Sequence, residues 1–318
     1  MFHFTIRLFG TVSVQRNNHN IESFPSAKAK ELFCYLLLQR DRSHSREVLA
    51  SLLWEECPAH LSKKYLRQVL WQLQQTLHGQ MPGESSRLIK ADDESLRLDS
   101  HAHLWIDAAV FEQAFVPLQG VAGEQITEQQ ARGLVDVIPL YKGDLLEGHY
   151  QDWCLYHRER FHNMYCAMLD KLMGYCEARG KYEAGMAHGE LLLRQDQACE
   201  RTYFRLIRLH YLAGDRAGAL RQFQRCEAAL QKELAVPPSH RTIELYNLVR
   251  ADRLEHQKIS PAQSTELAAS GISKSLFLTR LRAIRSVLAK IHRRLEREIR
   301  EVDRVLTADS HPPDAGRH

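Results

Sequence analysis

The stretch that most constrains the fold is Leu61 to His78, whose apolar residues repeat at the spacing of an α-helix. In a helix, one apolar face would pack on the core and would consist of Leu66, Val69, Leu70, Leu73 and Leu77. The opposite face would carry Lys64, Arg67, Gln68, Trp71 and Gln75. Arg and Lys contact phosphate or read guanine, and Gln can pair with adenine. This helix would suit the DNA major groove, and the alternative is a plain amphipathic surface helix with Trp71 packed at the rim of the core.

The residues before this helix predict a small sheet and two further helices. Ser26 is the expected N-cap of a helix that runs to about Gln39, and Ser45 of a helix that runs to Trp54. Alternating apolar and polar residues predict strands at 4–9, 12–14 and 20–24. The inward face of the second helix is expected to consist of Val48, Leu49, Leu52 and Leu53.

A β-hairpin is expected after the helix, because residues 87–90 and 96–98 flank an acidic turn at 92–94. Strands, three helices and a hairpin make a winged helix-turn-helix, in which the hairpin, or wing, reaches a phosphate or the minor groove. The wing cations are Arg87, Lys90 and Arg97, with solvated hairpin charge as the alternative. The other candidate DNA-binding cations are Lys28, Lys30 and Lys63.

The charge balance gives this interpretation little support. The chain has 318 residues and a net charge of +4, yet residues 1–107 hold 13 Lys and Arg against 12 Asp and Glu. Residues 260–318 hold 11 Lys and Arg against 7 Asp and Glu. DNA binding by the first segment must therefore depend on the local placement of its cations.

The middle of the chain carries a repeat. Arg179-Gly180-Lys181 and Ala213-Gly214-Asp215 are offset by 34 residues, the period of tetratricopeptide repeats, in which two helices meet at a Gly turn and cross at small residues. An irregular helical bundle is the alternative. Asp107 is an expected N-cap for the helix that opens this region. The repeat helices are expected at 161–178, 181–194, 201–213 and 216–234.

The C-terminal part predicts a linker at 257–276, one long helix at 277–307 and a disordered tail at 308–318. From Phe277 to Leu306 the apolar residues are spaced alternately by four and three positions, with one stutter between Leu295 and Ile299, which is the pattern of a coiled-coil seam. This seam could pack on the preceding domain, on a second copy in a homodimer, or on a partner, and the pattern does not choose among them.

Two groups of motifs resemble a known family. The runs SREVLASLLW at 45–54, LRQVLWQLQQTL at 66–77 and WIDAAVFEQAF at 105–115 resemble the OmpR-type winged helix of SARP (Streptomyces antibiotic regulatory protein-like) activators. The runs YKGDLLEG at 141–148 and LAVPPSHRTIELY at 234–246 resemble the bacterial transcriptional activator domain that follows it. The resemblance covers roughly residues 4–250.

The resemblance implies DNA binding at direct repeats near promoters and contact with RNA polymerase, here through the loop Glu55 to His60. It places Arg67 at the position of a recognition-helix arginine. It also implies that the second domain mediates dimerisation, polymerase contact or signal reception. Where the family often has a basic LRRAL, this chain has Gln74 and Gln75, which implies fewer phosphate contacts and a weaker dependence of affinity on salt.

Enzymatic motifs are absent from the sequence. There is no Walker A motif and no H-E-x-x-H, and the seven cysteines form no C-x-x-C. We therefore expect no enzymatic activity, no cofactor and no metal. The cysteines predict reduced thiols in a cytoplasmic protein, and we expect no membrane association because no apolar run is long enough to span a bilayer.

Together these patterns predict a mainly α fold with a small β component. A winged helix-turn-helix at 1–107 is expected to precede a tetratricopeptide-like domain at 108–256 and a long C-terminal helix. The predicted function is that of a sequence-specific regulator, an activator by resemblance, that binds double-stranded DNA. The alternative is an interaction adaptor whose tetratricopeptide-like domain binds a protein partner and whose winged helix is a weak or vestigial DNA binder.

Overall fold

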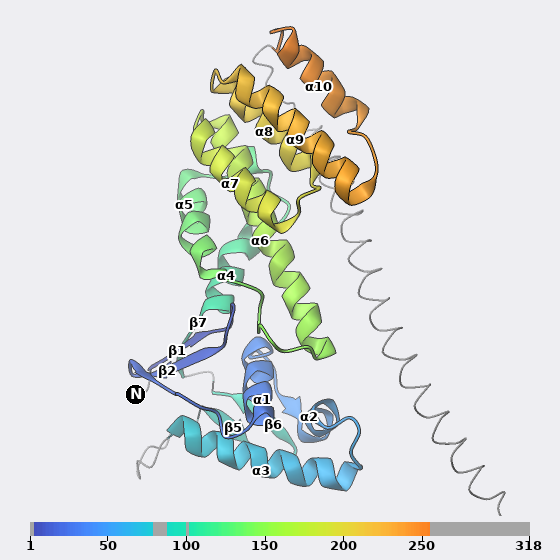
Figure 1. The fold of residues 1–318 in the computed structure, drawn as a ribbon. Coiled ribbons are helices and arrows are strands. Elements are labelled where there is room, and N and C mark those ends of the chain that lie inside the picture. Colours follow the sequence, from blue (N-terminus) through green and yellow to red (C-terminus); the bar gives the residue numbers. More distant parts are fainter. Residues whose placement is uncertain (1–2, 79–87, 100–101, 255–318) are drawn as a thin grey trace, which may run out of the picture. The chain divides into compact units, whose positions relative to one another are not determined.

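Two small sheets frame three helices in the N-terminal part of the chain (Figure 1), seen in a computed structural model that describes residues 3–78, 88–99 and 102–254. The first sheet has the order β3-β2-β1-β7, and β1 pairs with β7 in parallel. The second sheet has the order β4-β6-β5 and is antiparallel; β5 and β6 form the wing. The strands are β1 (His3–Arg7), β2 (Ser13–Arg16), β3 (His19–Asn20), β4 (His44–Ser45), β5 (Ile89–Ala91), β6 (Ser95–Leu98) and β7 (His103–Ile106).

The three helices are α1 (Ala27–Leu38), α2 (Arg46–Leu53) and α3 (Ala59–His78). Both expected caps form, because the Ser26 hydroxyl accepts a hydrogen bond from the Ala29 N–H and the Ser45 hydroxyl accepts one from the Glu47 N–H. The predicted inward position of Val48 is wrong. The side of α2 turned to the core consists of Leu49, Ala50 and Leu53, which leaves Val48 on its outer edge with 58% of its surface exposed.

The N-terminal strands differ from prediction at their ends. The third strand comprises only His19–Asn20, and β1 stops at Arg7 because the next residues pair elsewhere. The Gly10 N–H donates to the Asp144 carbonyl over 2.9 Å, and the Leu146 N–H donates to the Leu8 carbonyl over 2.8 Å. The sequence from Leu8 to Gly10 therefore joins the first sheet to a segment more than 130 residues away.

From Asp107 to Arg250 the structure is helical, and Gly180 and Gly214 adopt positive φ values of 69° and 81° in the two turns of the 34-residue repeat. The first repeat helix begins at Asp152, earlier than the predicted Phe161. The helices are α4 (Asp107–Phe115), α5 (Glu128–Val137), α6 (Asp152–Ala178), α7 (Tyr182–Gln195), α8 (Glu200–Leu212), α9 (Arg216–Leu234) and α10 (His240–Arg250) (Figure 1). Three 3-10 turns lie between them at Val116–Leu118, Gly123–Gln125 and Ile138–Leu140.

Small residues allow the repeat helices to cross closely, as the repeat predicts. A Cβ atom at Gly189 on α7 would lie 2.6 Å from a methyl carbon of Leu206 on α8 and 2.9 Å from the Met173 Cε on α6. A side chain at this position would require Leu206 and Met173 to move, so glycine allows these three helices to meet closely.

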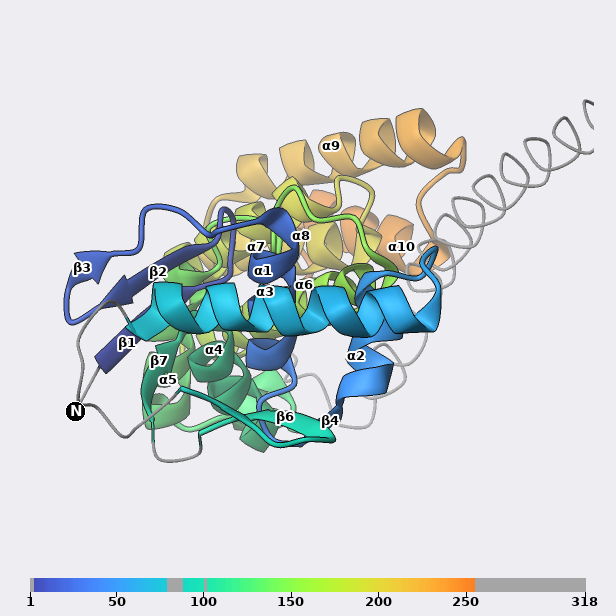
Figure 2. The same cartoon turned by 90° about the horizontal axis from the view of Figure 1, so that it is seen from below.

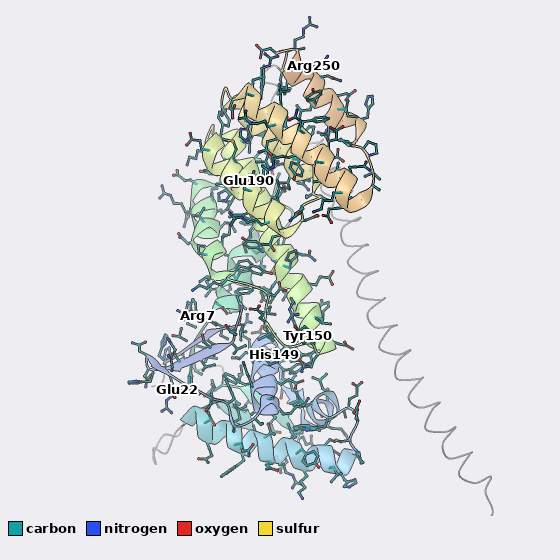
Figure 3. All side chains as sticks on the ribbon, in the orientation of Figure 1. Arg7, Glu22, His149, Tyr150, Glu190 and Arg250 are labelled. Carbon is teal, nitrogen blue, oxygen red and sulfur yellow. The ribbon has the colours of Figure 1, made fainter. Side chains whose placement is uncertain are left out.

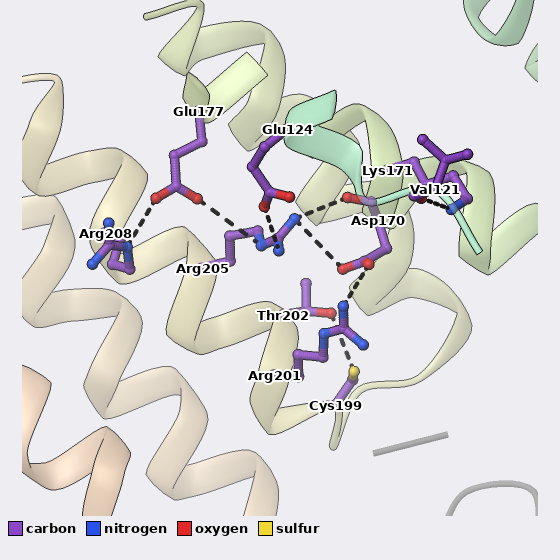
Figure 4. A network of polar contacts seen from close by, with 10 residues as sticks. All are labelled: Val121, Glu124, Asp170, Lys171, Glu177, Cys199, Arg201, Thr202, Arg205 and Arg208. Atoms are coloured by element: carbon purple, nitrogen blue, oxygen red, sulfur yellow. Dashed lines mark hydrogen bonds and ion pairs between the residues drawn. The ribbon is translucent and has the colours of Figure 1, made fainter. Parts of the chain in front are cut away.

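An ionic network also holds α6 and α8 together (Figure 4). Arg205 on α8 lies within 4.0 Å of three carboxylates, those of Glu124, Asp170 and Glu177. Arg201 pairs with Asp170 over 2.7 Å, and Arg208 pairs with Glu177 over 2.9 Å. These three arginines are spaced three and four residues apart, so they line one side of α8.

The winged helix and the helical region share one hydrophobic core. Phe9, just after β1, lies 5.1 Å from Phe111 on α4, 5.0 Å from Tyr141 and 5.5 Å from Phe161 on α6, measured between ring centroids. The fold is mainly α with a small β component, as predicted. The linker, helix and tail predicted beyond residue 256 lie outside the described residues.

Candidate nucleic-acid interface

Helix α3 presents the candidate interface on the side of the winged helix that faces away from α4–α10. In the view from below, α3 crosses in front of the other elements (Figure 2). Its apolar back packs on the core, and every residue predicted there is at most 8% exposed. Its front is therefore oriented by the burial of its back, and the predicted front residues Lys64, Arg67, Gln68, Trp71 and Gln75 are all exposed.

The front of α3 keeps its functional groups available. Within the part of the chain that the structure describes, Lys64 and Arg67 form no ion pair, so both charges can meet a phosphate or a base edge. Trp71 has 62% of its surface exposed and does not pack at the rim of the core. The ring of Trp71 is therefore held in solvent between Arg67 and Gln75 and is free to contact other molecules.

The other predicted cations are in different environments. Three of them already pair with carboxylates: Lys28 with Glu31, Lys63 with Glu47 and Lys90 with Asp99, at 2.8, 2.9 and 2.8 Å. Glu31 and Asp99 are buried, so the ion pairs of Lys28 and Lys90 have a structural role in the fold.

The three remaining cations also differ. Lys30 is half-buried and lies near His149, in the segment before α6, where burial and then the charge of Lys30 lower the pKa of His149. Arg97 is exposed on the wing and has no ion pair among the described residues. Arg87 lies outside the described residues.

An aspartate shapes the tip of the wing. The Asp92 carboxylate accepts hydrogen bonds from the Glu94 N–H, the Ser95 N–H and the Ser95 hydroxyl. The bonds from Ser95 contribute most to lowering the pKa of Asp92. The Ser95 hydroxyl also receives a hydrogen bond from Ser43, just before α2, over 2.8 Å. The tip is therefore an ordered acidic turn tied to α2, and the positive charge of the wing lies further back, at Lys90 and Arg97.

Two attachments of α3 were not predicted. Arg16 on β2 donates to the Leu77 carbonyl over 3.0 Å, which satisfies an acceptor that the end of a helix leaves open. Gln74 donates through Nε2 to the Ile89 carbonyl on β5 over 3.3 Å. The helical period alone could not identify these residues, because their partners lie in separate strands.

Asp107 is not the helix cap that was predicted, because Ile106 occupies the cap position and Asp107 is the first residue of α4. Its buried carboxylate accepts hydrogen bonds from the N–H groups of Leu8 at 2.8 Å, Phe9 at 3.1 Å and Ala108 at 2.7 Å. Burial raises the pKa of Asp107, and the three N–H groups oppose that rise. Asp107 therefore fastens the start of α4 to the end of β1, while Ile106 holds the cap position without a side-chain bond.

The motif at 141–148 holds the other side of this junction. Leu145 and Leu146 are fully buried, and Leu146 has a positive φ of 53°. Arg158 on α6 donates to the carbonyls of Leu145, Leu146 and His149 at 3.0, 2.8 and 2.8 Å. The Arg158 guanidinium thus donates hydrogen bonds to three carbonyls of a loop that packs on the winged helix. The sequence did not indicate this role.

Polar side chains line the junction between α1 and α6. The imidazole of His157 is 6% exposed, and its Nε2 lies 3.0 Å from the amide nitrogen of Gln39. The rings of Tyr35 and Trp153 meet edge to face at 5.3 Å. His149 and Tyr150 lie beside α1 where the chain enters α6 (Figure 3). This junction combines apolar contact with two imidazoles, His149 and His157, whose pKa values are lowered chiefly by burial.

Stability is expected to fall below about pH 6.5 because of this junction. Burial, then Arg160, lowers the pKa of His157 from 6.5, with Glu112 opposing and Arg42 assisting. Below about pH 6.5, His157 binds a proton in the unfolded chain before it does so in the folded protein. The free energy of unfolding therefore decreases as the pH falls from about 6.5 through the lower pKa that His157 has in the folded state. His157→Gln should reduce the loss by up to about 1.4 kcal/mol per pH unit in urea unfolding between about pH 5 and 8.

The exposed His60 supplies the control for this prediction. His60→Gln should leave the dependence of stability on pH as it is in the wild type. His44, His149 and His188 also have pKa values lowered by burial, so His157→Gln should reduce the slope without removing it. An unchanged slope in His157→Gln would show that this imidazole does not report on the junction.

The described residues contain no group of three or more His, Cys, Asp or Glu placed to hold a metal ion. No helix within 3–78 or 102–254 is long and apolar enough to cross a membrane.

Comparisons with known proteins agree with this architecture. Residues 106–250 match the family model of the bacterial transcriptional activator domain. The fold is similar to that of Mycobacterium tuberculosis EmbR, solved in complex with a low affinity phosphopeptide, with a TM-score of 0.60 and 18% sequence identity. That similarity covers 87% of this chain and 71% of the EmbR chain. No curated protein matches the chain.

The matched region begins at the residue before α4 and ends with α10, so it contains the whole helical region behind the winged helix. The matched domain is one of transcriptional activators. The chain therefore carries a bacterial transcriptional activator domain at residues 106–250, and its winged helix and helical region together have a fold similar to that of EmbR.

Proposed function

We propose that this protein is a sequence-specific, double-stranded-DNA-binding regulator that activates transcription from promoter repeats. The single observation that supports this most is the front of α3, where Lys64 and Arg67 are exposed and lack ion pairs within the described chain. Arg67 would read a guanine edge, Gln68 and Gln75 adenine edges, and Lys64 a phosphate. Trp71 would contact a thymine methyl group or a sugar.

The wing and the loop before α3 supply the remaining contacts. Arg97 and the exposed part of Lys90 would hold the phosphates beside the groove. In the loop Glu55–His60, every residue except the half-buried Cys57 is exposed, which supports its proposed contact with RNA polymerase. Such a regulator would act in the cytoplasm, where the chromosome and polymerase are.

The test is to retain fragments of the source genome on purified protein and sequence them. Wild-type protein should enrich sites with a repeated motif. Arg67→Ala should bind such a site about 5- to 150-fold more weakly, because losing a two-bond contact to a base removes about 1–3 kcal/mol. Arg132→Ala, at an exposed arginine on α5, is the matched control and should bind like the wild type. Equal affinity of wild type and Arg67→Ala would remove the recognition-helix assignment.

An interaction adaptor is the second candidate, and the ion pairs of Lys28, Lys63 and Lys90 favour it because they reduce the charge available to DNA. The salt dependence of binding separates the two. If Lys64, Lys90 and Arg97 each meet a phosphate, log affinity should fall with log salt at a slope of about −3. An adaptor should show almost no DNA binding and therefore no such slope.

A further inference from the structure

Gln74 lies between the front of α3 and the wing. It is seven residues after Arg67 and three after Trp71, so it continues the stripe that those residues form on the helix. Unlike Arg67 and Trp71 it is half-buried, because its amide reaches the Ile89 carbonyl on β5 over 3.3 Å. One side chain thus connects the proposed base-reading face to the hairpin.

The acceptor of this bond is a carbonyl on an open edge of the sheet. β5 is the last strand in the order β4-β6-β5. The Leu88 carbonyl points inward and accepts from the Asp99 N–H over 2.8 Å. Because carbonyls alternate along a strand, the Ile89 carbonyl points outward, away from β6. Gln74 supplies the donor that a neighbouring strand would otherwise supply.

The position of β5 determines the position of the wing cation. Lys90 pairs directly with Arg97 across the hairpin, one residue from Ile89, so the two side chains share a face. Lys90 is also held by the buried Asp99 over 2.8 Å. Arg97 is therefore linked to α3 through two short steps, the pairing of β6 with β5 and the hydrogen bond from Gln74.

We propose that Gln74 is a positioning residue that sets the distance between α3 and the wing, and with it the spacing on DNA between the contacts of α3 and those of Arg97. This inference rests on the proposed function. Gln74 itself does not need to touch DNA, since it acts through the Ile89 carbonyl.

The first measurement needs no DNA. Gln74→Met keeps the length of the side chain and removes its donor, and Gln72→Met makes the same change on α3 at a side chain with no hydrogen bond among the described residues. Hydrogen exchange of residues 88–98 should become about 2- to 12-fold faster in Gln74→Met, the effect of one hydrogen bond of about 0.5–1.5 kcal/mol. Gln72→Met should exchange like the wild type. Equal exchange in both variants would overturn the proposal.

The second measurement is a hydroxyl-radical footprint on a DNA site recovered with the wild-type protein. Arg97→Ala identifies the protections that belong to the wing. Gln74→Met should weaken or shift those protections and leave the protections due to α3 in place. A footprint identical to the wild type would overturn the positioning role alone. If the wild-type protein protects no DNA while exchange still separates the two variants, the proposed function fails and the spacing inference fails with it.

Discussion

Asp107→Ala is expected to lower the free energy of unfolding by about 3 kcal/mol or more. The Asp107 side chain is buried and accepts from the N–H groups of Leu8, Phe9 and Ala108. Alanine leaves these donors unpaired at the point where the end of β1 meets the start of α4, and each unpaired buried donor costs about 1–3 kcal/mol. The measurement is urea unfolding followed by circular dichroism.

Two further variants make this prediction specific. Asp136→Ala, at an exposed carboxylate on α5, should change stability by less than about 0.5 kcal/mol. Asp107→Asn keeps one acceptor oxygen, so its free energy of unfolding should lie between those of the wild type and Asp107→Ala. A loss in Asp107→Ala no larger than in Asp136→Ala would mean that the carboxylate does not hold the junction.

Arg205→Met is expected to lower the free energy of unfolding by about 3–5 kcal/mol, because it removes the cation that three carboxylates surround. The Arg205 side chain is 14% exposed, and Glu177 beside it is 10% exposed. Burial alone would lower the pKa of Arg205, but Asp170, Glu177 and Glu124 together raise it. Removing the cation leaves negative charges that the interior cannot solvate, so α6 and α8 should separate more easily under denaturant.

The control is Arg225→Met on α9. Arg225 also pairs with a carboxylate of a preceding helix, Glu190 on α7, over 2.7 Å, but both side chains are more than 40% exposed. Arg225→Met should therefore lower the free energy of unfolding by less than about 1 kcal/mol. Adding Glu124→Gln to Arg205→Met should recover part of the loss, because Glu124 has no other ion pair among the described residues and its unpaired charge is removed. Equal losses in Arg205→Met and Arg225→Met would show that burial does not decide the strength of this network.

The elements that repeat over short distances could be predicted from the sequence. The 3.6-residue period of α3 identified both its buried back and its exposed front, because the period is a property of the helix itself. Ser26 and Ser45 identified helix starts, since a cap bonds within its own first turn. Gly180 and Gly214 identified the repeat, because both turns need a positive φ.

The errors fall where local pattern and tertiary packing compete. Val48 is as hydrophobic as its neighbours, yet α2 is short and only one edge of it meets the core, so Val48 is exposed. The strand predicted to continue to Phe9 ends at Arg7, because Leu8 to Gly10 bond to residues 144–147. No window of the sequence around residue 8 contains that partner.

The sequence by itself determined the three helices of the winged helix, the helices of the 34-residue repeat and the residues that α3 presents to solvent, because these follow from side-chain period and capping within a few residues. Only the tertiary structure decided which cations remain unpaired and which polar groups join the parts. Lys28, Lys63 and Lys90 meet carboxylates. Asp107, Arg158 and Gln74 meet backbone groups of other segments. A hydrogen bond acts over about 3 Å in space, and neither residue type nor spacing along the chain encodes that distance.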